Sequence, residues 1–169
     1  MYSLLSLTDG DFNTGVGAAT LLANTRNENT ATGAGGLLSN TTGVANTANG
    51  DRALLSNTTG NFNTATGFAA LHDNMDGVGN TATGASALQH NTTGGLNTAI
   101  GENALFSNTE CTENTATGAN ALSNNIGGEG NTAIGAAALF ANTAGNGNTA
   151  VGRDALSANT SGPIEHGGG

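Results

Sequence analysis

A 17-residue pattern repeats nine times along this 169-residue chain and leaves little of the sequence outside it. Each copy follows Asn-Thr-Ala-(Thr/Ile/Val)-Gly-x-x-Ala-Leu-x-x-Asn-Thr-Thr-Gly-x-x, and we number its positions 1 to 17 in that order. A fixed period this short is typical of a solenoid, in which each repeat forms one coil. The copies begin at Asn13, Asn29, Asn46, Asn63, Asn80, Asn97, Asn114, Asn131 and Asn148, so every interval is 17 residues except the first, which is 16.

Several repeat positions do not vary; among them, position 2 is Thr, position 9 is Leu and position 12 is Asn in all nine copies. Stacked coils would place these identical residues above one another, where Asn amides can hydrogen-bond from coil to coil. No apolar 3.6-residue period is present, and Gly, Asn and Thr are poor helix formers. The sequence therefore predicts an all-β protein, a single β-solenoid of about nine 17-residue coils with Asn, Leu and Thr ladders.

Each coil is expected to contain two short strands, one over positions 1–5 and one over the Ala-Leu-x-x-Asn segment. Gly at positions 5 and 15 would permit the turns between them. One coil buries about one Leu and a few small residues, roughly 1.5–3 kcal/mol, against an ordering cost of roughly 1–2 kcal/mol per residue. No coil can be stable alone, so we expect one continuous rod without an internal domain boundary.

The two ends of the chain depart from the pattern. Residues 1–12 are interpreted as a partial coil that caps the stack, with Leu4 in the Leu column, Thr8 in the second Thr column and Gly10 in a turn-Gly column. Residues 13–164 form the nine-coil solenoid, and residues 165–169 are expected to leave the repeat as a flexible tail.

Composition excludes several classes of function. The formal net charge is −9, with three Arg and no Lys, which argues against binding to nucleic acid. The sequence shows no apolar run long enough to span a membrane, and residues 1–10 do not have the pattern of a signal peptide, which could have been removed beforehand. We expect the protein to act outside the cell as a secreted protein. The single Cys111 excludes an internal disulfide and occupies a turn-Gly position, which we interpret as drift of the repeat.

Motifs for chemistry are almost absent. The segment that begins at Asp9 imitates a calcium loop, but Thr14 and Thr20 stand where Gly and Glu are needed. His72 and His90 fall in different coils and columns with no matching carboxylate pattern, so acid–base catalysis is not expected. Four glycosylation sequons, among them those at Asn40 and Asn57, arise from the repeat itself. We predict no enzyme, no metal and no cofactor.

The most regular surface comes from the first strand, because positions 2 and 4 of a strand point to the same side. Facing outward, they would form a flat lattice of hydroxyls and methyls, spaced roughly 6.7 Å along the strand and about 4.8 Å between coils. Positions 1–5 of the nine repeats carry no charged residue. Such a surface suits ice, and its predicted ice-binding residues are Thr14, Val16, Thr30, Thr32, Thr47, Asn49, Thr64, Thr66, Thr81, Thr83, Thr98, Ile100, Thr115, Thr117, Thr132, Ile134, Thr149 and Val151.

The opposite orientation stays open, because side-chain alternation alone does not say which side is buried. Ala at position 3 is the small residue that a thin interior needs, and Asn49 would fit poorly in a core; both favour outward Thr. Val16, Ile100 and Ile134 would be ordinary core residues, which favours the reverse. With the reverse orientation, the second Thr column becomes the candidate face: Thr41, Thr58, Thr92, Thr109, Thr143 and Thr160.

Two resemblances bear on this choice. The run from Asn131 to Gly145, Asn-Thr-Ala-Ile-Gly-x-x-Ala-Leu-x-x-Asn-Thr-x-Gly, resembles repeats of bacterial and phage tail-fibre and trimeric adhesin-head proteins. That resemblance covers nearly the whole chain and implies a left-handed β-roll, a trimer and an inward-facing Ile. The Thr-x-Thr ladder is similar in architecture to solenoid antifreeze proteins of insects and cold-water microbes, although the insect cysteines are missing and the coil is longer.

Three hypotheses follow. An ice-binding (antifreeze) protein would be a monomer with ice or ordered water as its only partner, and would bind neither nucleic acid nor membrane. A structural or adhesive module of a bacterial or phage fibre would be a trimer that buries one face of the solenoid. A polysaccharide-active enzyme would need paired carboxylates in a groove, and the repeat supplies none in register. The charge-free Thr lattice favours the first.

Overall fold

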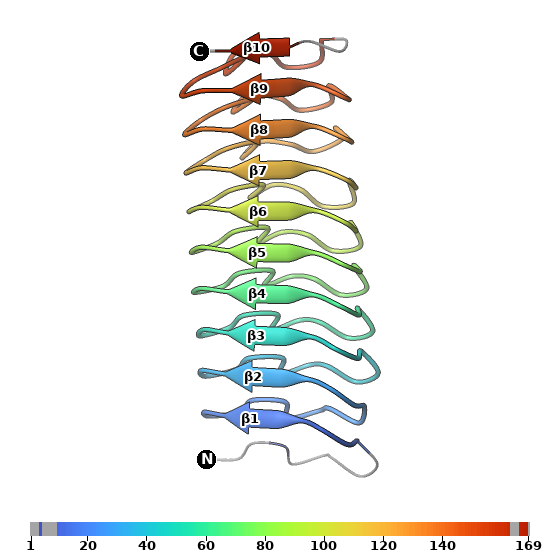
Figure 1. Cartoon of the computed structure of the whole chain (residues 1–169). Coiled ribbons are helices and arrows are strands. Elements are labelled where there is room, and N and C mark those ends of the chain that lie inside the picture. Colours follow the sequence, from blue (N-terminus) through green and yellow to red (C-terminus); the bar gives the residue numbers. More distant parts are fainter. Residues whose placement is uncertain (1–3, 5–9, 163–165, 169) are drawn as a thin grey trace.

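The computed structural model is a rod of stacked coils, in which each repeat contributes one coil (Figure 1). It describes residue 4, residues 10–162 and the backbone of residues 166–168. Ten short strands form one parallel sheet in sequence order. They are β1 (Thr14–Val16), β2 (Thr30–Thr32), β3 (Thr47–Asn49), β4 (Thr64–Thr66), β5 (Thr81–Thr83), β6 (Thr98–Ile100), β7 (Thr115–Thr117), β8 (Thr132–Ile134), β9 (Thr149–Val151) and β10 (His166–Gly168).

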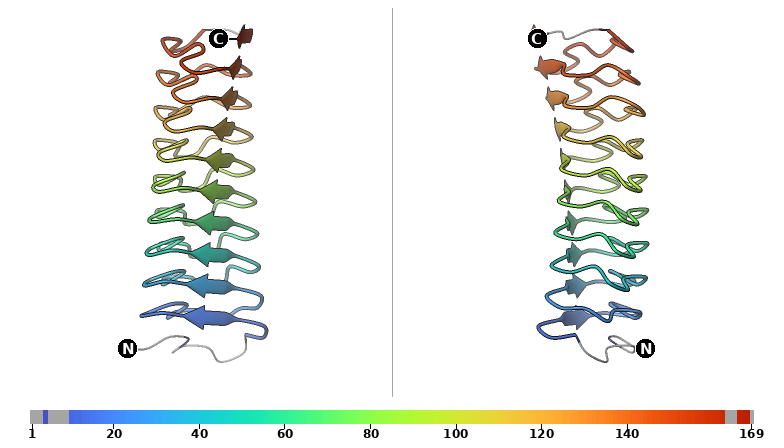
Figure 2. Two further views of the ribbon diagram at one scale, coloured as in Figure 1. Left: turned by 60° about the vertical axis from the view of Figure 1, so that its left-hand side comes forward. Right: turned by 90° about the vertical axis from the view of Figure 1, so that its right-hand side faces the viewer.

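The strands stack along one side of the rod, and bent segments stack along the other sides (Figure 2). Register is kept at every step: Thr81 pairs with Thr98, and Thr98 pairs with Thr115. In Figure 1 the strands run from right to left across the front while the chain climbs, so the coil is left-handed. The predicted all-β solenoid with a 17-residue coil is therefore confirmed.

The interior of the rod is narrow and is built from Ala and Leu. The central Ala of each strand from β2 to β9 is fully buried, as Ala82 is, and it packs in one cluster with the Ala and Leu of positions 8 and 9. Ala87 and Leu88 show this arrangement within one coil. Since each coil adds only these few apolar side chains, backbone and amide hydrogen bonds between coils must supply the rest of the cohesion.

Two columns of buried Asn run along the interior as hydrogen-bonded ladders. At position 12, Asn91 Nδ2 donates to Asn74 Oδ1 at 2.8 Å and to the carbonyl of Gly94 at 2.9 Å. At position 1, the backbone N–H of Asn97 donates to Asn80 Oδ1 at 3.0 Å. The predicted Asn ladders are confirmed, and they satisfy polar groups that would otherwise be costly to bury.

Glycine at position 5 is required where adjacent coils approach most closely. Gly84 has a φ of +133°, and a Cβ atom there would lie 2.5 Å from the carbonyl oxygen of Gly101 in the next coil. A real side chain would collide with that backbone, which explains why all nine repeats carry Gly at this position.

The second strand predicted in each coil is wrong. The Ala-Leu-x-x-Asn segment is a series of bends, because its Leu adopts a left-handed conformation in every coil; Leu88, for example, has a φ of 51°. Coil-to-coil hydrogen bonding nevertheless continues here, since Leu88 N–H donates to the carbonyl of Ala104 at 2.9 Å. A left-handed residue costs roughly 1–2 kcal/mol, which full burial of the Leu side chain offsets.

The ends of the rod extend the same scheme. Leu4 shares the left-handed φ of the Leu column, and its N–H donates to the carbonyl of Thr20 at 3.1 Å, as expected for a partial coil in register. Thr8 lies outside the described residues. Residues 166–168 were expected to leave the repeat with the tail, yet their backbone adds β10 to β9, with His166 opposite Thr149, one full period later. Backbone pairing at an open strand edge does not depend on matching side chains.

Candidate binding face on the strands

The outer surface of the sheet is formed by repeat positions 2 and 4, and it twists gradually along the rod (Figure 2). In each strand from β2 to β9 the central Ala is buried, whereas the residues on either side of it are exposed or half-buried. In β1 the centre is Gly15, between the exposed Thr14 and Val16. Of the two orientations that the sequence left open, the structure has the outward one. We call this surface, positions 2 and 4 of β1–β9, the strand face.

Aliphatic residues at position 4 also face solvent. Val16 is 61% exposed, Ile100 and Ile134 are each 43% exposed, and Val151 is 48% exposed. The inward-facing Ile implied by the resemblance to adhesin heads is therefore not found. The strand face combines Thr methyls and hydroxyls with these branched aliphatic side chains in columns that are aligned by the register of the strands.

Most hydroxyls of the strand face have no partner within the protein. Across residues 10–162, Thr32 is the only strand-face Thr whose hydroxyl donates a hydrogen bond inside the chain, to Asn49 Oδ1 at 2.7 Å. The other hydroxyls, such as those of Thr81, Thr83 and Thr98, are therefore available to water. A hydroxyl donates one hydrogen bond and accepts two, so the face offers water a regular array of both kinds of site.

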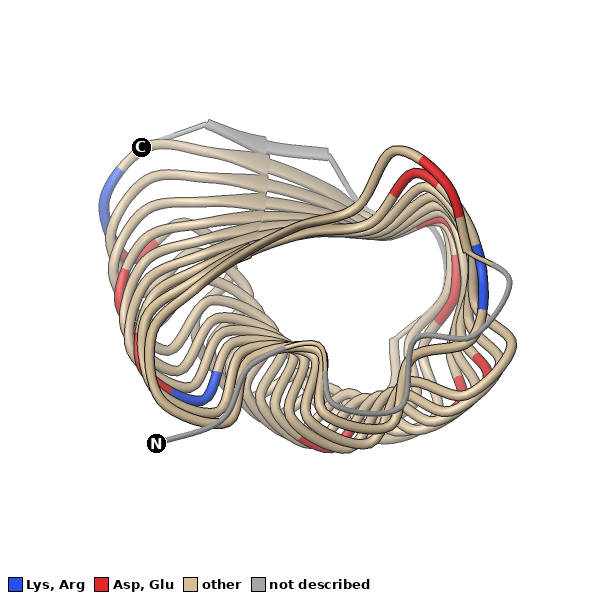
Figure 3. Cartoon of the chain, turned by 90° about the horizontal axis from the view of Figure 1, so that it is seen from below, with Lys and Arg blue, Asp and Glu red and all other residues tan. Residues whose placement is uncertain are grey.

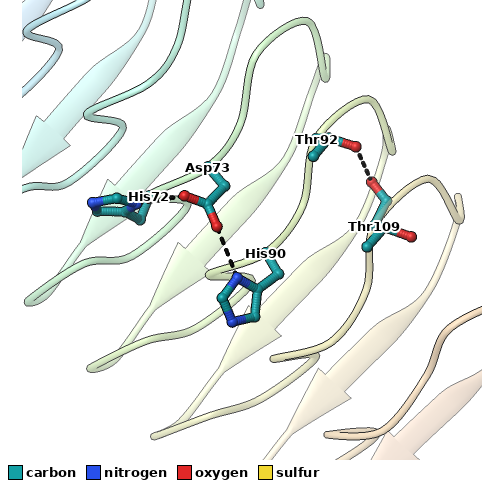
Figure 4. Close-up of polar contacts among 5 residues, drawn as sticks. All are labelled: His72, Asp73, His90, Thr92 and Thr109. Atoms are coloured by element: carbon teal, nitrogen blue, oxygen red, sulfur yellow. Dashed lines mark hydrogen bonds and ion pairs between the residues drawn. The ribbon is translucent and has the colours of Figure 1, made fainter.

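The second Thr column has a structural use instead. Thr92 Oγ1 donates to the backbone carbonyl of Thr109 in the next coil at 3.1 Å, as Figure 4 shows. Thr41, Thr58 and Thr143 donate to the next coil in the same way. These hydroxyls are occupied in holding the coils together, so this column is a poor alternative binding surface.

Charged residues lie away from the strand face. In the view along the rod, the described Asp, Glu and Arg residues occupy the corners of the coils and the sides opposite the strands (Figure 3). Asp51 and Arg52 come after β3 and Gly50 and form an exposed ion pair at 4.0 Å. Glu113 directly precedes the buried Asn114. The face is thus uncharged but bordered by charges that keep the rod hydrated.

A histidine–carboxylate cluster corrects one interpretation of the sequence. His72 and His90 do share a carboxylate: Asp73 Oδ1 lies 2.6 Å from His72 Nδ1, and Asp73 Oδ2 lies 2.7 Å from His90 Nδ1 (Figure 4). Burial alone would raise the pKa of Asp73, but its hydrogen bonds and charge interactions with the two imidazoles outweigh burial and lower that pKa. The signal in the sequence was the 17-residue separation of Asp73 and His90, which stacks them in adjacent coils.

The Cys111 corner is a local defect in the stack. At the same corner one coil earlier, the backbone N–H groups of Thr92, Thr93 and Gly94 all donate to the carbonyl of Thr109. In the coil of Cys111 no such backbone bonds are formed among the described residues, and the Cys111 thiol donates to the carbonyl of Ile126 at 3.0 Å instead. Burial, followed by the charge of Glu129, raises the pKa of this thiol.

Other candidate sites from the sequence do not assemble. Within the described part of the chain, no group of three or more His, Cys, Asp or Glu residues is placed to hold a metal, and no pocket is present. Asp9 of the calcium-like segment lies outside the described residues. The sequon residues Asn40, Asn57 and Asn91 are fully buried in the ladder, where no glycan could be attached. The described residues also include no helix of the length and apolarity needed to cross a bilayer.

Fold and face together define a class: a parallel β-solenoid with internal Asn ladders and an uncharged, Thr-rich strand face. Comparisons with protein families, with curated proteins and with solved structures find no match to this chain.

Proposed function

We propose that this protein binds ice through the strand face. The observation that carries the proposal is the array of aligned, uncharged Thr columns, whose hydroxyls donate no hydrogen bond to the described residues except at Thr32. A charged group organises its own hydration shell, whereas a rigid mixture of hydroxyls and methyls can hold water in an ice-like order. Parallel pairing at every step fixes the spacing of this array, at about 4.8 Å between coils.

The proposed mechanism is adsorption without chemistry. The ordered water on the face merges with the ice lattice, and the bound molecules pin the growing front between them. Growth between the pinned points requires a curved front, so the freezing point falls while the melting point does not. No catalytic step, cofactor or metal enters this mechanism, and the partner is ice or ordered water. An ice-binding role would place the protein outside the cell, as a secreted monomer.

The decisive test is thermal hysteresis, the gap between melting and freezing points, measured with ice-crystal shape. Thr83 is exposed at the middle of the strand face, and Thr83→Tyr places a bulky ring that projects from this face. We expect the wild-type chain to shape crystals and the variant to lose most of the hysteresis. Thr93 belongs to the same coil but lies exposed on a different side, so Thr93→Tyr is the matched control.

The control variant should keep wild-type hysteresis, and circular dichroism should show the same fold for both variants. A wild-type chain without hysteresis refutes the proposal. Equal activity of Thr83→Tyr and the wild type would remove the strand face as the binding surface.

A fibre or adhesin module is the second candidate, and one observation favours it. Apolar side chains stand exposed at repeat positions 16 and 17, just before the strands: Phe62 is 65%, Val78 41% and Leu96 63% exposed. Buried at a threefold axis, they would hold a trimer together. Light scattering distinguishes the two functions, because ice binding predicts a monomer at high concentration and the fibre module predicts a trimer.

A further inference from the structure

The strand face is interrupted at one place. Thr32 in β2 and Asn49 in β3 are register partners, and the Thr32 hydroxyl donates to Asn49 Oδ1 at 2.7 Å. This is the one hydrogen bond between side chains on the strand face of the described residues. It withdraws a hydroxyl from water and leaves the Asn49 amide, which is exposed, as a differently shaped polar group in the lattice.

The coil of β3 departs from its neighbours at the adjoining corner as well. Asp51 and Arg52 come after β3 and Gly50, and both side chains are more than half exposed. The corresponding residues after β4 are Phe68 and Ala69, which carry no charge. Charges at this corner are not confined to the coil of β3, because Glu102 follows β6 and Arg153 and Asp154 follow β9 at the same repeat positions. The amide of Asn49 within the face is therefore the feature that distinguishes this coil and favours ordinary hydration at this level of the rod.

Beyond this coil the face is continuous. The six strands β4 to β9 present only Thr, Ile and Val at positions 2 and 4. None of their Thr hydroxyls donates a hydrogen bond within the described chain, and their register is unbroken from Thr64 to Thr149.

We propose that the effective ice-binding surface is β4–β9, and that Asn49 sets its boundary by capturing the Thr32 hydroxyl. This inference rests on the proposed ice-binding function. According to this inference, β1–β3 support the solenoid but add little to ice binding, despite their similar sequence. The Asn49 side chain then determines how far the ordered water extends along the rod.

Substitution of Asn49 tests the boundary directly. Asn49→Thr restores the repeat pattern and should join the strands of the N-terminal coils to the active face, from six strands to nine. We expect thermal hysteresis at equal concentration to rise, at most by the ratio 9/6 of the strand numbers. Asn49→Val removes the acceptor without adding a hydroxyl and should also raise activity, because the Thr32 hydroxyl becomes available to water.

A matched pair of variants separates capture of a hydroxyl from the mere presence of an amide. Thr83 follows Thr66 in register, so the amide of Thr83→Asn can accept from the Thr66 hydroxyl. Thr117 follows Ile100, which has no hydroxyl, so Thr117→Asn places the same amide on the face without a donor to capture. Both positions are followed by an Ile in the next coil. We expect the larger loss of hysteresis from Thr83→Asn.

The outcomes are distinct. Greater activity of both Asn49 variants, with a larger loss in Thr83→Asn than in Thr117→Asn, supports the inference. An active wild-type chain with unchanged activity in Asn49→Thr, or with equal losses in the two Asn variants, overturns it and leaves ice binding intact. A wild-type chain without hysteresis overturns the proposed function and this inference together. Circular dichroism of each variant verifies that the solenoid is folded.

Discussion

Replacement of a ladder Asn should cost more in the middle of the rod than near its end. Asn91 takes part in three side-chain hydrogen bonds: its amide donates to Asn74 Oδ1 and to a backbone carbonyl, and its Oδ1 accepts from Asn108 Nδ2 at 2.9 Å. Asn91→Ala removes all three bonds and leaves Asn74 Oδ1 buried without a donor. At about 1 kcal/mol for each bond and about 1 kcal/mol for the unpaired acceptor, the expected destabilisation is about 4 kcal/mol.

Asn142 occupies the same column near the end of the rod, but among the described residues it makes only two such bonds, because its Oδ1 has no hydrogen-bond partner there. Asn142→Ala removes these two bonds and deprives Asn125 Oδ1 of its donor, yet it also deletes the unpaired Asn142 Oδ1. The expected cost is therefore about 2 kcal/mol, half that of the central variant.

Urea unfolding followed by circular dichroism measures both free energies of unfolding. The two losses are expected to differ by about 2 kcal/mol, and both variants make the same chemical change. Equal destabilisation by the two substitutions, or a loss below about 1 kcal/mol for Asn91→Ala, would refute the view that the ladder bonds hold the coils together.

Three further predictions concern the frame of the rod. Cys111→Gly should stabilise the protein by about 1–2 kcal/mol in urea unfolding, because it lets the backbone bonds to Ile126 form; no gain would show that the defect has another cause. Gly84→Ala should lower the melting temperature or prevent folding, since its Cβ would collide with the backbone of Gly101; a melting temperature equal to wild type would contradict that packing. The pKa of Asp73 is lower in the folded protein than its ordinary value of 3.8. Its contribution to the free energy of unfolding is therefore complete above pH 3.8 and is lost as the pH falls through the lower pKa of the folded protein. The stability difference between wild type and Asp73→Asn should therefore shrink in acid titration below pH 3.8, and a constant difference would argue against the cluster.

The repeat pattern predicted the coil, the ladders and the turns because each of them depends on which residues stack on one another. In a solenoid with a fixed period, residues that are one period apart stack in adjacent coils. It favoured outward Thr through the small Ala at position 3, and burial of residues such as Ala82 confirms the orientation. What the pattern did not contain was the sign of φ. Leu is common in extended strands, so nothing in the sequence indicated that Leu88 and its equivalents are left-handed.

Contacts between columns were also missed. His72 lies at position 10 and His90 at position 11, so a comparison of the two histidines alone found no relation. Asp73 joins them as a sequence neighbour of one and a stacking neighbour of the other. The use of the second Thr column, as at Thr92, likewise depends on the direction of a hydroxyl, which residue identity does not give.

The close backbone contact at position 5 limits how such a chain can change in length. At this position the backbones of adjacent coils approach too closely for a side chain, as at Gly118 and Gly135, so an insertion within that contact would break the stack. Removal or duplication of a full period would reproduce every bond between the coils on either side. The first repeat is one residue shorter than the others, and the stack tolerates this. In that repeat the carbonyl of Arg26 accepts the hydrogen bond from Asn24 Nδ2 that a position-15 Gly carbonyl accepts in later repeats. Unequal recombination between repeats could therefore lengthen or shorten the rod in unit steps, and with it the area of the surface that the strands present.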